Sequence, residues 1–225
     1  MIGGWTVAAS LQPRYDPVAD TVSALAAQGA TDRWVMTLTF LLVGGCYIVT
    51  ALALRPAGAA GRLILIAGAL AGMAVAANPE HPADPYPVPH IIAAAAGFAG
   101  LITWPAGAWR RGPAVPWGLR PAVAATAVAV LFAPVLWFGV ELVLASGQIG
   151  LAERVAGGTQ AVWPLAVVLS CRMSRPHHKA VKARAAAAAP RTAPPAACQA
   201  VWSRTVTRDQ PSSPTSRNPP STSGP

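Results

Sequence analysis

Ionisable side chains interrupt a largely apolar sequence at few positions, and Glu141 is the most informative of them. It follows a run of 20 uncharged residues and precedes four more apolar ones. A charge inside an apolar stretch is costly, so it predicts a partner or a water-filled cavity, with Arg154 and His90 as the candidate partners. The alternative is a side chain that extends to the nearby membrane surface.

A second group of ionisable residues lies in the segment NPEHPADPYPVPH, residues 78–90. Glu80, His81 and His90, together with Glu141, form a hypothetical ligand set, because imidazole and carboxylate groups are common metal ligands. The four prolines after His81 stiffen the segment, and the spacing matches no helical ligand pair. The sequence therefore favours no metal and no cofactor, and the metal site stays the weaker alternative.

The remaining polar residues of interest occur near the ends of apolar stretches. The predicted ligand-binding residues are Asp20, Ser23, His90, Glu141, Glu153 and Arg154. Glu153 and Arg154 also have an ordinary structural interpretation, an acid at a helix N-terminus followed by an interfacial arginine. The sequence has no Walker loop, dinucleotide fingerprint, nucleophile elbow or His-Glu-x-x-His motif. It therefore identifies no catalytic residue and favours a protein that is not an enzyme.

Composition indicates an integral membrane protein. Of the 225 residues, 53% are hydrophobic and 11% are charged, about half of the ~25% that is usual in soluble domains. The formal charge of +9 lies mostly in the tail: residues 1–171 hold eight Arg and seven Asp or Glu, and residues 172–225 hold nine Lys or Arg and one Asp. Without aromatic interleaving or a recognisable fold signal, this basicity does not indicate nucleic-acid binding.

Five apolar stretches have, or nearly have, the ~20 residues that a membrane-spanning helix needs. They lie at about 34–54, 62–78, 88–109, 121–145 and 155–171. None alternates like a barrel strand, and all are rich in Ala, Leu, Val and Gly. The predicted fold class is an all-α integral membrane protein, a bundle of five full transmembrane helices.

The charges outside these stretches alternate from loop to loop. All seven acids of residues 1–171 fall on one side: Asp16, Asp20, Asp32, Glu80, Asp84, Glu141 and Glu153. The loops on the other side are purely basic, with Arg55, Arg62, Arg110, Arg111 and Arg120. The positive-inside rule then predicts that the basic loops and the C-terminus are cytoplasmic.

Three segments flank the predicted spans. Residues 1–12 are apolar but too short to cross a membrane, so we expect a truncated first span from a mis-assigned start codon. Residues 13–33 predict a short amphipathic helix that lies on the outer membrane surface or over the mouth of the bundle, as a connector or as a lid. Residues 172–225 predict a basic, disordered tail rich in Pro, Ser and Ala.

Two parts of the sequence resemble a known family: the first full predicted span with the segment before it, and the last predicted span. The pattern Asp20-Thr-Val-Ser23-Ala-Leu25…Gly29…Trp34-Val-Met36…Phe40…Gly44, followed by Leu54-Arg55, resembles the bacterial membrane family labelled domain of unknown function 998. The segment GLAERVAGGTQAVWPLAVVLS, residues 150–170, is similar to the last span of that family. The resemblance covers roughly residues 5–171 and implies six helices, a multi-pass place in the bacterial cell membrane, and no established activity.

Three functional hypotheses follow. The first is a protein that binds or moves a small amphipathic, lipid-like ligand in an outward-facing pocket. The second is a membrane-embedded, metal-dependent hydrolase that uses Glu80, His81, His90 and Glu141. The third is a non-catalytic structural or partner-binding membrane protein. The lipid bilayer is the expected partner in each case, and the sequence leaves the oligomeric state open.

Overall fold

The computed structural model describes residues 1–84 and 87–188, and residues 175–188 by their backbone alone. This part of the chain is helical and includes one compact unit, Met1–Ala180, with the next unit beginning at Val181. The helices are α1 (Ile2–Ser10), α2 (Trp34–Ala53), α3 (Ala59–Ala77), α4 (Val88–Ala108), α5 (Pro121–Leu144) and α6 (Ile149–Ala188). Short 3-10 helices, η1 (Ser23–Ala26) and η2 (Trp117–Leu119), lie between them.

Four of the predicted spans are confirmed as helices of the expected length. Within the described residues, α2, α3, α4 and α5 are long and apolar enough to cross a membrane. Their ends lie within about three residues of the boundaries that hydropathy alone predicts. Prolines begin two of them: Pro89 lies in the first turn of α4, and Pro121 is the first residue of α5. Proline suits this position because the first turn leaves its N–H groups without helical partners.

The helix that contains the predicted fifth span, residues 155–171, extends beyond that span. The helix α6 begins at Ile149 and continues to Ala188. Residues 172–188 are rich in Ala, Arg and Lys, which are strong helix formers, so the helix propagates past the apolar stretch. The rest of the predicted disordered tail, residues 189–225, lies outside the described residues.

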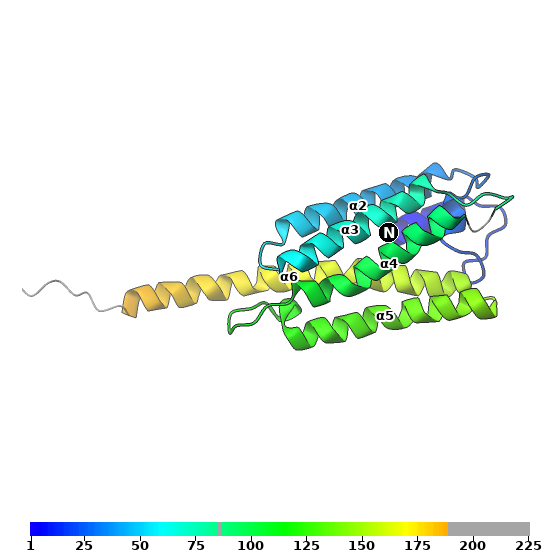
Figure 1. The fold of residues 1–225 in the computed structure, drawn as a ribbon. Helices are drawn as coiled ribbons and strands as arrows, with labels where there is room; N and C mark the ends of the chain where they lie inside the picture. Colours follow the sequence, from blue (N-terminus) through cyan, green and yellow to red (C-terminus); the bar gives the residue numbers. More distant parts are fainter. Residues whose placement is uncertain (85–86, 189–225) are drawn as a thin grey trace, which may run out of the picture. The chain divides into compact units, whose positions relative to one another are not determined.

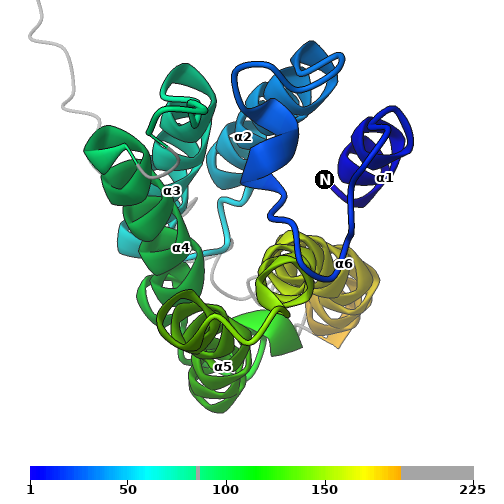
Figure 2. The same cartoon turned by 90° about the vertical axis from the view of Figure 1, so that its right-hand side faces the viewer.

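The helices of the first unit run along a common bundle (Figure 1), and they follow one another in chain order around it (Figure 2). A view along the bundle shows α1 between α2 and α6, with α3, α4 and α5 on the opposite side (Figure 2). The largest packed cluster of buried side chains lies near the basic loops and joins α2, α3, α4 and α6, through residues such as Leu65, Trp104 and Val167. A second cluster at the other end joins α1, η1 and α2, through residues such as Trp5, Leu25 and Met36.

Glycines bring α3 and α4 into backbone contact. A Cβ atom on Gly100 would lie 2.6 Å from the Cα atom of Gly68, and one on Gly107 would lie 2.7 Å from the backbone nitrogen of Gly61. At the end of the pair, the Gly58 N–H donates a 2.8 Å hydrogen bond to the Ala108 carbonyl. Small residues allow this approach, which is a common source of helix association in membranes.

The predicted amphipathic helix at residues 13–33 is wrong. The segment forms turns and the four-residue helix η1, because several of its backbone N–H groups bond to side chains and interrupt the helical pattern. Asp16 accepts from the Val18 N–H, and Asp20 accepts from the Asp16 N–H. Val22 and Leu25 are 1% and 0% exposed. The segment therefore folds over the mouth of the bundle, the second of the two predicted positions.

Candidate functional site

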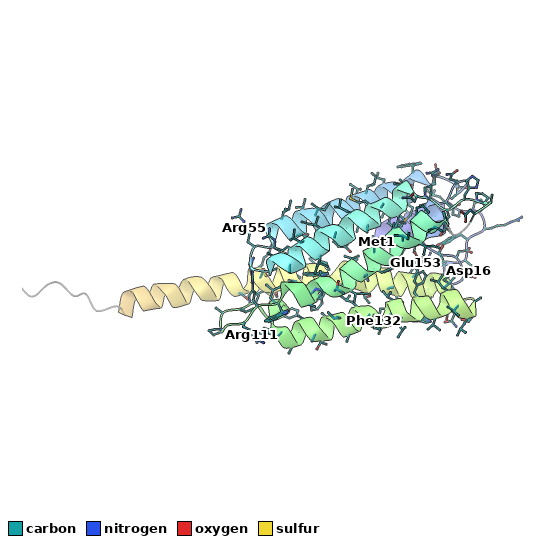
Figure 3. All side chains as sticks on the ribbon, in the orientation of Figure 1. Met1, Asp16, Arg55, Arg111, Phe132 and Glu153 are labelled. Atoms are coloured by element: carbon teal, nitrogen blue, oxygen red, sulfur yellow. The ribbon has the colours of Figure 1, made fainter. Side chains whose placement is uncertain are left out.

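The two ends of the bundle differ in charge. Figure 3 shows Arg55 and Arg111 at one end and Asp16 at the other, with Glu153 close to the Asp16 end. The purely basic loops 54–58 and 109–120 thus share one end, and the acid-containing segments 11–33 and 78–84 share the other, together with the connection 145–148 between Glu141 and Glu153. The alternation of loop charge that the sequence predicts is present in space. We name the second end the acidic end.

A cavity of about 100 Å³ lies below the segment that covers the acidic end. Its wall is formed by α2, α3, α4 and α6, with Val22 and Ser23 from the covering segment and Met1 beside them. Most of the lining side chains are apolar, and the polar exceptions are Ser23, Tyr47, Glu153 and Gln160. An apolar cavity with a few convergent polar groups is the usual form of a small-molecule site.

Glu153 is the charged group in the wall of this cavity, and it is only 8% exposed. Its carboxylate accepts a 2.6 Å hydrogen bond from the Val22 N–H and a 3.3 Å hydrogen bond from the Ser23 hydroxyl. Among the described residues, no Lys, Arg or His nitrogen lies within 4 Å of it. A carboxylate offers about four acceptor positions, so these two neutral donors leave capacity for another partner.

Arg154, the next residue, is committed to the covering segment. Its guanidinium donates to the carbonyl oxygens of Pro17 and Asp20 at 2.7 Å and 3.0 Å, and to that of Gly150 at 2.9 Å. It also donates to the Tyr15 hydroxyl and lies over that ring at 5.3 Å from the centroid. These contacts hold the segment against the start of α6, and we call them the Arg154 clasp.

Gly150 allows the clasp to close. A Cβ atom there would collide with the Asp20 carbonyl and would lie 2.9 Å from that of Pro17. In the same turn, the Leu151 N–H donates to the Val18 carbonyl at 3.1 Å. The covering segment thus supplies an acceptor to the first turn of α6, where backbone N–H groups have no helical partner.

Glu80 and His90 form a second polar pair at the acidic end. The His90 Nε2 atom lies 3.6 Å from the Glu80 carboxylate, and its Nδ1 atom lies 2.8 Å from the Asn78 carbonyl. The Glu80 carbonyl accepts from the Gln28 N–H at 2.8 Å, which connects this loop to the covering segment. Burial raises the pKa of the Glu80 carboxyl to about 7.

This raised pKa predicts that stability falls as pH rises. A carboxyl whose pKa is higher in the folded protein than in the unfolded chain favours folding most below the unfolded value, and this contribution is lost as pH passes the folded value. Between about pH 5 and pH 8, the free energy of unfolding should therefore fall less in Glu80→Gln than in the wild-type protein, by about 1 kcal/mol. Thermal unfolding in detergent at both pH values measures this. Asp16→Asn, an exposed acid at the same end, is the control, and an unchanged slope in Glu80→Gln would contradict the prediction.

Glu141 does not reach either predicted partner. Its carboxylate accepts from the Ser146 hydroxyl at 2.5 Å, from the Trp137 indole N–H at 3.2 Å and from the Gln148 N–H at 3.3 Å. Its donors thus come from its own helix and from the connection that follows, and they stabilise the left-handed C-cap at Ala145. Local donors can satisfy a carboxylate without a distant cation, which is why the predicted pairing with Arg154 or His90 is wrong.

The structure brings together four of the six predicted ligand-binding residues. Ser23 and Glu153 meet at the cavity, and Asp20 and Arg154 meet in the clasp above it. His90 lies beside Glu80, and Glu141 lies in the α5 C-cap. Sequence reasoning missed Gln160 and Tyr47, although Glu153, Gly157 and Gln160 follow at i, i+4 and i+7. That spacing places them on one face of a helix and could have identified the wall of the cavity.

The hypothetical metal ligands do not assemble. Of Glu80, His81, His90 and Glu141, the first and third are within 4 Å of each other, whereas the other two bond to their own loops. In the described ranges, no group of three or more His, Cys, Asp or Glu side chains has the arrangement of a metal site. The hydrolase hypothesis therefore lacks its ligand set.

Comparison with known proteins assigns the chain to a family. A search of curated proteins and of solved structures finds no match to the chain. One family model matches residues 1–170, the first unit almost to its end, and its description is a protein of unknown function. Because this match covers well over half of the sequence, the chain belongs to the DUF998 family of proteins of unknown function.

Proposed function

We propose that the protein is a multi-pass protein of the bacterial cell membrane that binds a small amphipathic ligand in the cavity at its outward, acidic end. The observation that supports this is an apolar cavity of about 100 Å³ with a buried carboxylate, Glu153, in its wall. For comparison, an engineered cavity of about 150 Å³ binds benzene. The cavity therefore suits a small molecule or the end of a larger one, whose polar group would contact Ser23, Glu153 and Gln160.

The proposal includes a fifth span at residues 155–171 of α6. Its polar side chains Gln160 and Ser170 are 2% and 0% exposed, whereas the exposed side of this helix carries Val162, Leu165 and Leu169. A helix with its polar groups inside the bundle and apolar groups outside suits a lipid environment. With five spans and the basic loops at one end, the positive-inside rule assigns the C-terminus to the cytoplasm.

Filling the cavity tests the proposal. Gly72 lines the cavity and has no atom within 4 Å of the position that a Cβ would take, so Gly72→Leu should occupy the space without disturbing the fold. Short-chain alcohols and single-chain lipids should raise the unfolding temperature of the wild-type protein in detergent, and Gly72→Leu should abolish that increase. Gly45→Leu, also in open space but outside the cavity, is the matched control.

Two results would count against ligand binding. One is the absence of a thermal shift with every compound of the series in the wild-type protein. The other is an equal shift in Gly72→Leu and Gly45→Leu, which would indicate an effect of the detergent micelle. Either result would favour a non-catalytic structural or partner-binding protein.

A further inference from the structure

We infer that the cavity selects a ligand that carries a primary ammonium group on a small apolar body. This inference rests on the proposed function and names the chemical class of its ligand. It begins with the Glu153 carboxylate, which has donors from Val22 and Ser23 and no cationic partner within 4 Å among the described residues. A buried carboxylate without a cationic partner is most stabilised by a cation that also donates hydrogen bonds.

The surrounding charges favour a positive ligand. Glu80 is close enough for its charge to act on Glu153, which adds a second negative group at this end. Arg154 is the adjacent cation, but its donors are engaged by Tyr15, Pro17, Asp20 and Gly150. An anionic ligand would therefore meet two carboxylates and a guanidinium whose terminal nitrogens already donate to the covering segment and to Gly150, so its binding would be unfavourable.

The lining favours an organic cation over a metal ion. Hard metal ions need about six or more oxygen ligands, whereas the polar side chains in this wall are Ser23, Tyr47, Glu153 and Gln160. The remaining lining is apolar and includes Phe40 and Phe98. Aromatic faces attract ammonium groups, and the apolar wall suits the carbon atoms attached to them.

The volume limits the size of the ligand. A space of about 100 Å³ accepts an alkylammonium of a few carbon atoms or the ethanolamine end of a lipid. Both carry the same primary ammonium group. A lipid headgroup would also bring a phosphate to the acidic end of the bundle, so a free amine is the better fit to the charges.

Small probes of matched shape test this inference on the full-length protein in neutral detergent. The pH is set to ~8, above the value of about 7 to which burial raises the pKa of the Glu80 and Glu153 carboxyls. Butylammonium, butanol and butyrate each have a chain of four carbon atoms, and they differ in charge. Butylammonium should bind at least about tenfold more tightly than butanol, and butyrate should not bind. Isothermal titration calorimetry and thermal unfolding give the affinities. Micelles doped with lysophosphatidylethanolamine or lysophosphatidylcholine distinguish a lipid headgroup from a free amine.

Two isosteric variants identify the residue responsible. Glu153→Gln keeps a carbonyl acceptor for the Val22 N–H and removes the charge, so it should lose the preference for butylammonium while it retains butanol binding. Glu141→Gln is the matched control, because Glu141 is a buried acid of the same bundle that does not line the cavity. It should leave the butylammonium affinity unchanged.

The outcomes separate the two proposals. If butanol and butylammonium bind the wild-type protein equally, or if Glu153→Gln keeps the preference, the inferred ligand class is wrong and the binding cavity stands. If neither butanol nor butylammonium binds, both the proposed binding of a ligand in the cavity and the inferred ligand class are wrong. Tighter binding of butylammonium alone, lost in Glu153→Gln and kept in Glu141→Gln, supports the inference. Binding of lysophosphatidylethanolamine with the same dependence on Glu153 supports it with a lipid as the source.

Discussion

Gly100→Leu should prevent α3 and α4 from packing and should lower stability more than a typical substitution in this protein. The position of a Cβ atom at Gly100 is 2.6 Å from the Gly68 Cα atom and 3.0 Å from the Gly68 nitrogen. The obstructing atoms are backbone, so no side-chain rotation can relieve the contact. The two helices must separate, and the neighbouring contact between Gly61 and Gly107 is then lost as well.

The expected cost of this overpacking is about 3 kcal/mol or more. For a chain of this size, that corresponds to an unfolding midpoint about 6–12 °C lower. Thermal unfolding and size-exclusion chromatography of the detergent-solubilised protein measure the loss. Gly139→Leu on α5 is the control, because no atom lies within 4 Å of its Cβ position. Equal stability of the two variants would show that the glycine contact between α3 and α4 is not required.

Arg154→Met should release the covering segment from the acidic end. The substitution keeps most of the apolar stem and removes every guanidinium donor, so the carbonyl oxygens of Pro17 and Asp20 lose their partner. Hydrogen bonds from a charged donor contribute about 1.5–3 kcal/mol each when buried, and partial exposure reduces the sum here to about 2–4 kcal/mol. Arg154→Lys should restore little, because an ammonium cannot reproduce the planar fork that reaches several acceptors.

Hydrogen–deuterium exchange of peptides covering residues 13–26 gives the direct readout. The Val22 amide, which bonds to Glu153, should exchange about 30-fold faster or more in Arg154→Met. Arg14→Met is the control, since it removes a guanidinium from the same segment without loss of a clasp contact. Unchanged protection of Val22 in Arg154→Met would indicate that burial of Val22 and Leu25, and not the clasp, holds the segment.

The clasp and the cavity are structurally linked. Val22 and Ser23 belong to the segment that Arg154 holds, and both line the cavity and donate to Glu153. Release of the segment would therefore remove two donors from the carboxylate and open the cavity from above. For this reason, Arg154→Met should weaken ligand binding without changing a residue in the cavity wall.

Hydropathy and the alternation of charge from loop to loop sufficed to predict four of the long apolar helices and the two ends of the bundle. The apolar stretches that became α2, α3, α4 and α5 could be located because lipid-compatible helices need a minimum length and a nearly complete absence of charge. The side on which each charged loop lies follows from counting these helices. Helix C-termini were harder, and α6 continues past residue 171 because helix propensity does not end where hydropathy does.

Contacts between distant residues had to come from the tertiary structure. The sequence predicted an amphipathic helix at residues 13–33, but three backbone N–H groups of that segment bond to the side chains of Asp16, Asp20 and Glu153. Glu153 lies 131 residues from Val22, whose N–H it accepts. Periodicity reports only which residues would share a face if a helix formed. It carries no information about competing acceptors that lie far along the chain.

The same limit applies to the candidate site. From sequence, Glu141 and Glu153 are both acids near the outer end of an apolar stretch, and Glu141 is the more informative of the two because it lies inside its stretch. Packing distinguishes them, because Glu141 finds its donors within seven residues, whereas Glu153 is turned into a cavity and meets Val22 and Ser23. Residue types and their order determine which groups can enter the membrane and at which end they emerge. The three-dimensional packing of the helices determines which of those groups remain without a full set of partners, and so where a ligand can bind.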